Sequence, residues 1–288
     1  MVLLVVVAAG VTWAAVRLRA DGVASAPGDA AGDPGVAHVH GLGIDPADGS
    51  LHIATHFGTF RLVGSGPAER VGDGFQDTMG FTVVGANHFL GSGHPDIEGM
   101  QAGEPGRLGL IESTDAGETW RSVSLSGEAD FHALAFAHDQ VYGWDSTSGR
   151  FMVSADRTTW DNRSTLQLLS FAVDPDDDDH VIATTPEAVM ASTDGGRTWD
   201  RVDGPGLTVV AWEADGGLWG ATGSGEVYRS DTNAQSWTPA GALPGGPHAF
   251  LADGGSIYAA AEADGVTGIY RSTDGGGDWE LLYRDERP

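Results

Sequence analysis

The chain contains the segment STDAGETW at residues 113–120, and the pattern returns as STDGGRTW at residues 192–199 and as STDGGGDW at residues 272–279. Two altered copies, which keep the first serine and the last tryptophan, lie at residues 154–160 and 230–237. The five closing tryptophans are 40, 39, 38 and 42 residues apart. A fixed period of about 40 residues indicates one supersecondary unit repeated along the chain. Such a unit is too short to bury a face alone, so it must stack on its neighbours.

Each repeat contains four short segments in which apolar and polar residues alternate, and turn residues separate these segments. In the repeat that includes residues 192–199, the segments read LLSFAVD, HVIATT, AVMAST and TWDRV. Alternation with a period of two, bounded by Gly, Pro and Asp, predicts strands. Four-stranded units of about this length that are arranged radially are the blades of a β-propeller.

The four-strand unit can be traced six times, also where the tryptophan pattern is missing, as at residues 38–73. The sequence therefore predicts an all-β, six-bladed β-propeller of four-stranded blades over residues 37–288. Seven blades would be present only if one of the six traced units in fact contained two blades. We expect the repeated pattern to form the turn between the third and fourth strands, where Asp accepts backbone N–H groups and Gly supplies a positive φ. Its Trp should begin the fourth strand and pack between blades, which is a structural and not a catalytic role.

The composition restricts the classes of partner and of chemistry. The chain has 41 Asp and Glu against 15 Lys and Arg, a formal net charge of −26 and no Cys. Nucleic acid is excluded as a partner, because the basic patch that neutralises phosphates is absent. An acidic surface instead favours cationic ligands. Without Cys there is no disulfide, thiolate metal site, cysteine nucleophile or lipid-attached cysteine.

The N-terminal segment bears on the cellular compartment. Residues 2–16 are almost entirely apolar, which is short for a membrane-spanning helix but long enough for the hydrophobic region of a signal peptide. Arg17 and Arg19 follow this run, on the side opposite to that of a typical export signal. Residues 21–36 are rich in small residues and are expected to form a flexible linker. We therefore expect residues 1–20 to be a signal peptide or membrane anchor, with the propeller secreted or tethered outside the cytoplasmic membrane.

The pattern S-x-D-x-G-x-T-W resembles the Asp-box, or BNR repeat, of bacterial sialidases. Sortilin-type receptors, photosystem II assembly propellers and many exported bacterial proteins catalogued as glycosyl hydrolases share this repeat. The resemblance covers residues 38–284, and the opening HVHGLGIDPADGSLHIATHFGTFRL at residues 38–62 looks most like the last of these groups. The resemblance implies a propeller whose Asp-boxes lie on the rim, away from the central funnel.

A sialidase would need three arginines, a Tyr nucleophile with a Glu partner and an Asp acid/base. The Phe-Arg-Ile-Pro motif of that family is absent, and the nearest string, at residues 60–62, lies on a predicted third strand. Arg150, Arg229 and Arg271 occupy the same slot in their repeats, which indicates a repeated structural role, pairing between blades. No set of three arginines remains for the funnel, so a sialidase-like glycoside hydrolase that uses top-face carboxylates is the alternative and not the first hypothesis.

The ligand face of a propeller is built from the start of each innermost strand and from the loop between the second and third strands. Six of the ten histidines fall at such positions: His38, His40, His56, His94, His132 and His248. Imidazole is the commonest metal ligand, and residues two apart on a strand, such as His38 and His40, share a face. We predict a metal site formed by His38, His40, His56, Met79, His94 and His132.

Within this set we expect a core of His40, His56, His94 and His132, with Met79 or Met100 as a soft ligand. Copper fits a mixture of His and Met outside the cytoplasm, and zinc fits His with carboxylate. Calcium is a weaker fit, because the acidic run at residues 174–179 lacks the ligand spacing of known calcium loops.

Carboxylates predicted on the same face make hydrolase activity an alternative function. The candidates for catalysis are Asp77, Glu98, Asp130 and Asp145, with Asp96 close by, and Trp144 would suit a platform for a sugar ring. The first hypothesis is an exported, non-hydrolytic propeller that binds a metal ion or a small polar ligand. The alternatives are the glycoside hydrolase and a propeller that assembles with another protein.

Overall fold

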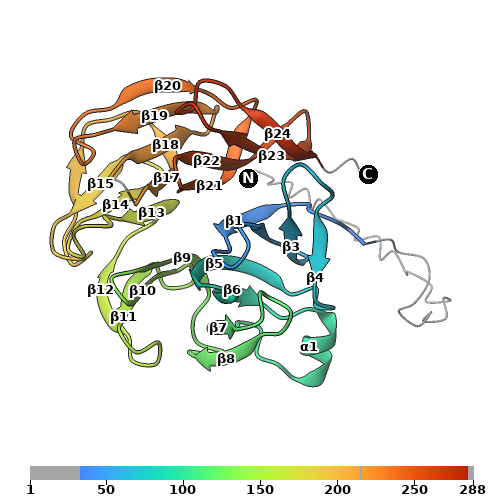
Figure 1. Ribbon diagram of the computed structural model, residues 1–288. Helices are drawn as coiled ribbons and strands as arrows, with labels where there is room; N and C mark the ends of the chain where they lie inside the picture. The colour runs from blue at the N-terminus through green and yellow to red at the C-terminus, as the bar shows by residue number, and fades with distance from the viewer. Residues whose placement is uncertain (1–32, 215, 285–288) are drawn as a thin grey trace, which may run out of the picture. The chain divides into compact units, whose positions relative to one another are not determined.

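The computed structural model describes residues 33–214 and 216–284. The expected leader at residues 1–20 and nearly all of the expected linker lie outside the described residues. Residues Pro34–Pro288 form one compact unit, which contains the six-bladed propeller predicted from the repeats (Figure 1). Among the described residues there is no helix of the length and apolarity needed to cross a membrane.

Every blade is an antiparallel sheet of four strands that follow one another in the chain. Blade one holds β1 (Val39–Ile44), β2 (Leu51–Thr55), β3 (Gly58–Leu62) and β4 (Glu69–Val71), and blade two holds β5 (Asp77–Gly85), β6 (His88–His94), β7 (Leu110–Ser113) and β8 (Arg121–Ser124). Blade three holds β9 (Phe131–Ala137), β10 (Gln140–Asp145), β11 (Arg150–Ser154) and β12 (Asp161–Thr165), and blade four holds β13 (Ser170–Val173), β14 (Val181–Thr184), β15 (Val189–Ser192) and β16 (Asp200–Val202). Blade five holds β17 (Leu207–Trp212), β18 (Leu218–Thr222), β19 (Glu226–Ser230) and β20 (Thr238–Ala242), and blade six holds β21 (Gly246–Asp253), β22 (Ser256–Ala263), β23 (Val266–Ser272) and β24 (Glu280–Arg284).

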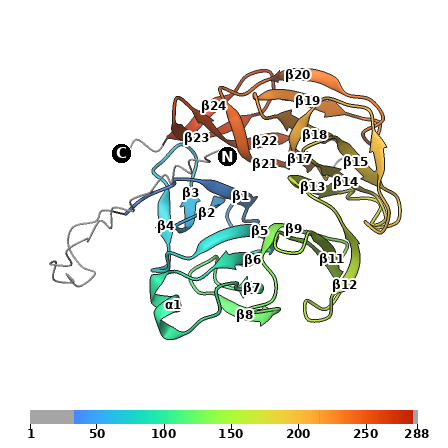
Figure 2. The same ribbon diagram turned by 180° about the vertical axis from the view of Figure 1, so that it is seen from behind.

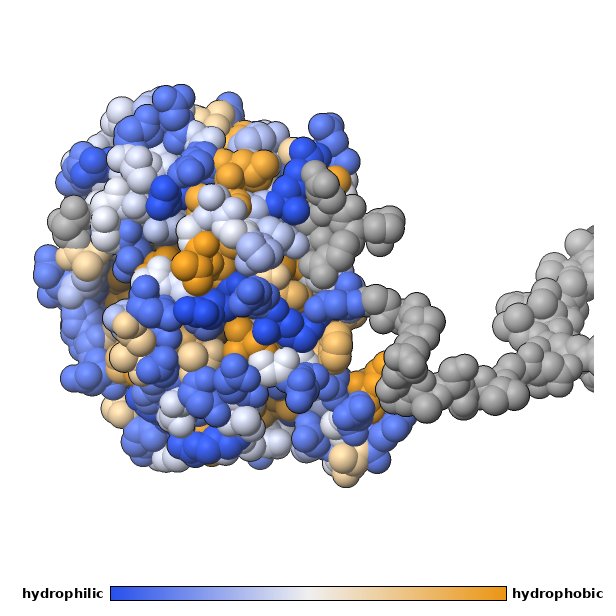
Figure 3. Space-filling model, turned by 45° about the vertical axis from the view of Figure 1, so that its right-hand side comes forward, coloured by the Kyte–Doolittle hydropathy of each residue, from blue (hydrophilic) through white to orange (hydrophobic). Residues whose placement is uncertain are grey.

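The first strand of each blade faces the centre of the ring and the fourth strand lies at the outside (Figures 1 and 2). Second strands such as β2, β14 and β18 are buried along their whole length, because they lie inside their own sheet and between neighbouring blades. Fourth strands such as β12 and β20 are mostly exposed. On the face shown in Figure 3, hydrophilic side chains cover much of the surface, with apolar groups between them.

The ring closes without exchange of a strand between its first and last blades, because each sheet uses four consecutive strands. Closure depends instead on one hydrophobic cluster in which Val39 and Phe60 of blade one pack with Ala260 and Ile269 of blade six. A hydrogen bond from Thr267 Oγ1 to the carbonyl of Ala37, 2.8 Å long, adds to this contact.

The repeated pattern forms the turn between the third and fourth strands, as predicted. In the copy at residues 192–199, Ser192 Oγ accepts the N–H of Gly196 and donates to Asp194 Oδ1, both at 2.8 Å. The Asp194 carboxylate accepts the N–H and the hydroxyl of Thr198 at 2.8 and 2.7 Å. These hydrogen bonds from Thr198 lower the pKa of Asp194 to about 2. The carboxylate therefore organises its own turn and is not free for catalysis.

The tryptophans that close these turns pack on the preceding blade, also as predicted. Trp199 lies against Phe151 of blade three with a ring separation of 5.4 Å, and its indole N–H donates to Ser164 Oγ at 2.9 Å. Trp160 makes the equivalent bond to Ser124 Oγ of blade two at 3.0 Å. In blades three and four the repeated pattern thus joins the blade to the one before it.

Buried acidic side chains organise the turns between the first and second strands. Asp45 Oδ1 accepts the N–H of Ala47 within its own turn at 2.8 Å and that of Asn87 in the next blade at 3.0 Å. In the acidic run of blade four, Asp174 accepts the N–H of Asp176 at 2.9 Å and lies 3.1 Å from His180 Nδ1. The first Asp of that run therefore has a structural role.

The connection between β6 and β7 contains a helix that sequence analysis did not predict, α1 (Ile97–Ala102). Asp96 caps its first turn by accepting the N–H of Gly99 at 2.8 Å, and Gly103 ends it with a φ of 88°. Glu98 lies in the first turn of this helix. Asp96, expected on the ligand face, is thus engaged in capping.

Candidate functional site

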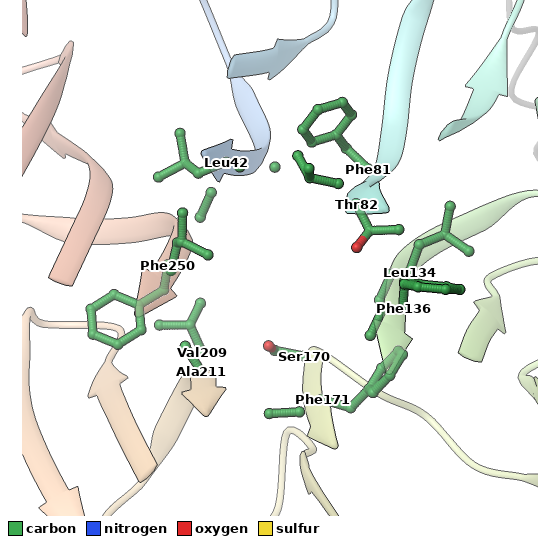
Figure 4. A pocket seen from close by; sticks show the side chains of 18 of the residues that line it. Leu42, Phe81, Thr82, Leu134, Phe136, Ser170, Phe171, Val209, Ala211 and Phe250 are labelled. Atoms are coloured by element: carbon green, nitrogen blue, oxygen red, sulfur yellow. The ribbon is translucent and has the colours of Figure 1, made fainter. Parts of the chain in front are cut away.

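The six innermost strands enclose a central channel of about 580 Å³ (Figure 4). Most of the labelled side chains in this view are apolar: Leu42, Phe81, Leu134, Phe136, Phe171, Val209, Ala211 and Phe250, with Thr82 and Ser170 as the polar exceptions. His40, Met79, His132 and His248 also line the channel, and each is the second or third residue of its innermost strand. The predicted ligand face thus brings imidazoles to an otherwise largely apolar channel.

Three imidazoles of blade one form a cluster with Asp77 of blade two, which we call the imidazole group (His38, His40, His56 and Asp77). One nitrogen from each histidine can be chosen so that all three lie within 4.8 Å of one another. His40 Nε2 is 3.2 Å from His56 Nδ1, and the rings of His38 and His56 are stacked at 5.2 Å. The rings of His38 and His40 lie 4.9 Å apart, although His38 precedes β1 and is not part of the strand, and His56 follows β2 directly.

Asp77 supplies an oxygen to the same point. Its Oδ1 lies 2.9 Å from His56 Nδ1 and 3.4 Å from His40 Nε2. This oxygen is buried, yet it has no partner of hydrogen-bond geometry within the described ranges. Asp77 Oδ1, His56 Nδ1 and His40 Nε2 therefore converge on one point.

The protonation states in this group suit a cation. Partial desolvation, reinforced by the rings of His248 and His40, lowers the pKa of His38 to about 4, although this residue is exposed at the surface. Burial likewise lowers the pKa of His40. Burial alone would raise the pKa of Asp77, but His40 and His56 outweigh it and hold that pKa below its usual value. Near neutral pH the group thus offers neutral His38 and His40 rings and an ionised carboxylate, which are the forms that bind metals.

His248 of blade six lies next to the imidazole group, because blade six adjoins blade one. Its ring is 4.3 Å from that of His38, and its Nε2 is 3.9 Å from Glu262 Oε2. Burial lowers its pKa. Sequence analysis placed His248 on the ligand face but did not include it among the ligands, since nothing in the sequence showed that it meets His38.

A second cluster, which we call the aspartate group, consists of His94, Asp130 and His132. Asp130 Oδ2 lies 2.9 Å from His132 Nε2 and 3.6 Å from His94 Nε2. Ser146 Oγ donates to the same oxygen at 2.9 Å. Burial favours a raised pKa for Asp130, but His132 and Ser146 outweigh it, so that its pKa lies below the usual value.

The histidines expected as one core therefore fall into two groups. His40 and His56 belong to the imidazole group, and His94 and His132 belong to the aspartate group. Met79 lines the channel, whereas Met100 is 54% exposed on α1.

The other candidates for catalysis are engaged in structural contacts or lie apart. Asp145 is fully buried and accepts the backbone N–H of Asp130 at 3.1 Å, the hydroxyls of Thr147 and Ser148, and a bond from Arg150. Burial opposes its ionisation, but these bonds outweigh burial and lower the pKa of Asp145 to about 2. Trp144 is only 8% exposed and donates to the carbonyl of Leu166 at 2.9 Å, so it is not available as a sugar platform.

The repeated arginines pair within their own blades and not between blades, which corrects the expectation from their register. Arg150 pairs with Asp145 at 3.2 Å and Arg271 with Glu280 at 2.7 Å, and in both cases the partners lie opposite each other on adjacent strands. Arg229 pairs with Asp231 at 2.8 Å. Their structural role agrees with the sequence analysis.

No protein-family model matches the chain, and no match was found among curated proteins. A GH74 xyloglucanase from Xanthomonas campestris superposes with a TM-score of 0.56 at 18% identity, covering 86% of this chain but only 45% of that enzyme. YCF48 bound to the D1 peptide superposes with a TM-score of 0.53 at 14% identity, covering 86% and 82% of the two chains. XC5397 of Xanthomonas campestris, described as a gluconolactonase, gives 0.59 at 14% identity, covering 78% and 84%. The superpositions show that this chain shares the fold of these proteins, and at these identities they show nothing about a reaction or a partner.

Proposed function

We propose that the protein is a non-hydrolytic binding propeller, exported from the cytoplasm, that holds a transition-metal ion through the imidazole group. The observation that carries the proposal is the convergence of His40 Nε2, His56 Nδ1 and Asp77 Oδ1, with separations of 2.9 to 3.4 Å. A cation among these atoms would satisfy all of them at once. Without one, the buried Asp77 oxygen contacts only the ring nitrogens of His40 and His56, in contacts that lack hydrogen-bond geometry.

Copper and zinc are the ions that this donor set favours. Imidazole suits both metals, and a carboxylate beside it suits zinc, whereas a thioether such as that of Met79 would favour Cu(I). The net charge of −26 raises the concentration of cations near the protein and so supports capture of an ion.

Binding is tested by titrating the full-length protein, purified without a histidine tag or chelator, with Cu(I), Cu(II) and Zn(II). We expect His56→Ala and Asp77→Asn each to weaken binding at the imidazole group by more than about tenfold, since each loses a donor. The His56 side chain is 42% exposed, so its removal should spare the fold. His138→Asn is the matched control, because His138 lies in the turn between β9 and β10 and contacts Asp174. Unchanged affinity in both site variants would refute the proposal.

A sialidase-like glycoside hydrolase and a protein-binding propeller remain the alternatives. A hydrolase needs a pair of free carboxylates, but Asp145 is held in its turn, while Asp77 and Asp130 lie against imidazoles. Turnover of aryl glycosides that disappears in Asp130→Asn would favour the hydrolase over the binding protein. Exposed apolar residues that would suit a protein partner include Phe57 and Phe75, next to the imidazole group in the sequence.

A further inference from the structure

We infer that the aspartate group is a second cation site, chemically distinct from the imidazole group, which takes a divalent transition ion such as Zn²⁺ through His94, Asp130 and His132. The site lies between blades two and three. His94 is the last residue of β6, Asp130 precedes β9, and His132 lies within β9. One donor atom from each of the three residues can be chosen so that all lie within 4.8 Å of one another.

The first observation is the tautomer of His94. Its Nδ1 is 2.7 Å from the carbonyl oxygen of Gly106, and a carbonyl only accepts hydrogen bonds, so Nδ1 carries the proton. In the neutral ring, Nε2 then has only a lone pair. A hydrogen bond of this kind, at the ring nitrogen that is not a ligand, is what orients metal-binding histidines.

The lone pair on His94 Nε2 faces the carboxylate of Asp130. His94 Nε2 lies 3.6 Å from Asp130 Oδ2, a carboxylate oxygen. Two acceptors at this distance repel each other unless positive charge lies between them. A bound cation turns this repulsive contact into two attractive ones.

The other oxygen of this carboxylate, Asp130 Oδ1, also lacks a partner among the described residues. The Asp130 side chain is only 5% exposed, and its Oδ1 is buried with no hydrogen-bond partner among the residues of known placement. Ser146 Oγ, at 2.9 Å, and His132 Nε2 already contact Oδ2. A buried, unpaired carboxylate oxygen is costly, and coordination of an ion would compensate it.

Two imidazoles and one carboxylate form the donor set of many zinc sites in which a fourth, open position holds water. The imidazole group differs in having three histidines. Because His132 also lines the central channel, the ion would lie beside that channel. The inference is independent of the imidazole group, which shares no residue with it.

The test is the stoichiometry of Zn²⁺ binding to the full-length protein by isothermal titration calorimetry. We expect two equivalents for the unmodified protein and for the control His138→Asn. Asp130→Asn and His94→Ala should each lose one equivalent, and Asp77→Asn should lose the other. The His94 side chain is 41% exposed, so His94→Ala should fold, which circular dichroism checks.

The outcomes separate the two sites. One equivalent that is lost only in Asp77→Asn would overturn the second site and leave the proposed function standing. One equivalent that is lost only in Asp130→Asn and His94→Ala would support the second site and show that zinc does not occupy the imidazole group, for which the copper titration then remains the test. If the protein binds no zinc, the inference is wrong, and ¹⁵N chemical shifts that show a doubly protonated His94 ring at neutral pH would identify a proton in the place of the cation.

Discussion

Gly196 shows how a single residue determines the shape of a repeated turn. Its φ of 88° lies in the left-handed region, and a Cβ placed on it would come within 2.3 Å of Phe151 Cε1 in the preceding blade. The glycine is needed both for its backbone conformation and for the space between two blades. The turn and the packing between blades therefore depend on the same position.

Gly196→Ala should lower the free energy of unfolding by more than about 2 kcal/mol, because it adds a steric clash to the strain of the positive φ. The matched control is Gly254→Ala, where φ is 56° but no atom lies within 4 Å of the added Cβ. In that variant the free energy of unfolding should fall by about 1 kcal/mol, from the strain of the positive φ alone. Urea denaturation measures both, and equal losses would show that the contact with Phe151 does not matter.

His52 is a buried histidine outside both candidate sites. It is 1% exposed, its Nε2 lies 3.3 Å from Ser50 Oγ, and its ring packs on Phe89 at 4.6 Å. Burial lowers the pKa of His52 from 6.5 to about 4. The native state therefore keeps this ring neutral at a pH where the unfolded chain would protonate it.

The sign of the resulting pH dependence follows from linkage. Above pH 6.5 the His52 ring is neutral in both the folded and the unfolded state. Between pH 6.5 and about 4 only the unfolded state binds the proton. The free energy of unfolding therefore falls as the pH is lowered through this window. We expect His52→Leu to reduce the loss of stability between pH 7 and 4 by at most about 3 kcal/mol. Urea denaturation at several pH values checks this, and an unchanged loss in the variant would contradict it.

At the scale of elements, the turn between β1 and β2 connects neighbouring blades through Asp45. This carboxylate accepts one N–H from its own turn and one from Asn87 of blade two. Asp45→Ala should leave two N–H groups without an acceptor and lower stability by about 1–3 kcal/mol. The amide of Asn87 should also lose protection from hydrogen exchange.

Asp48→Ala is the matched control for this turn, because the partners of Asp48, Arg61 and the N–H of Ser50, both lie in its own blade. It should cost about 1 kcal/mol, since one N–H loses its acceptor, and leave the exchange of the Asn87 amide unchanged. If both variants expose that amide equally, the link between the two blades does not depend on Asp45.

Strands and turns could be predicted because their signals are local. The Ser, Asp and Gly of residues 192–199 bond within four residues of one another, so their pattern shows the turn directly. The six residues of α1 carried no such signal, since a helix this short depends on its caps, Asp96 and Gly103. The partners of Arg150 and Arg271 were missed because cross-strand pairs depend on register, which the sequence alone did not provide.

For the whole molecule, comparison of equivalent positions in the six blades predicted a ligand face, but it did not predict which of its side chains contact one another. The sequence shows that His38 and His248 both lie near the start of an innermost strand. Only closure of the ring brings these rings to 4.3 Å, although the two residues are far apart in the chain. The division into an imidazole group and an aspartate group likewise depends on which neighbouring blades face each other.

Anomalous diffraction at the copper and zinc absorption edges would show whether the imidazole group binds a metal ion. Crystals of the full-length protein, grown after loading with each metal in turn, should show an anomalous peak bounded by His38, His40, His56 and Asp77, about 2.0–2.2 Å from the ligand atoms. Metal-loaded crystals in which these residues contact only one another, with no anomalous peak between them, would show that the imidazole group is not a metal site.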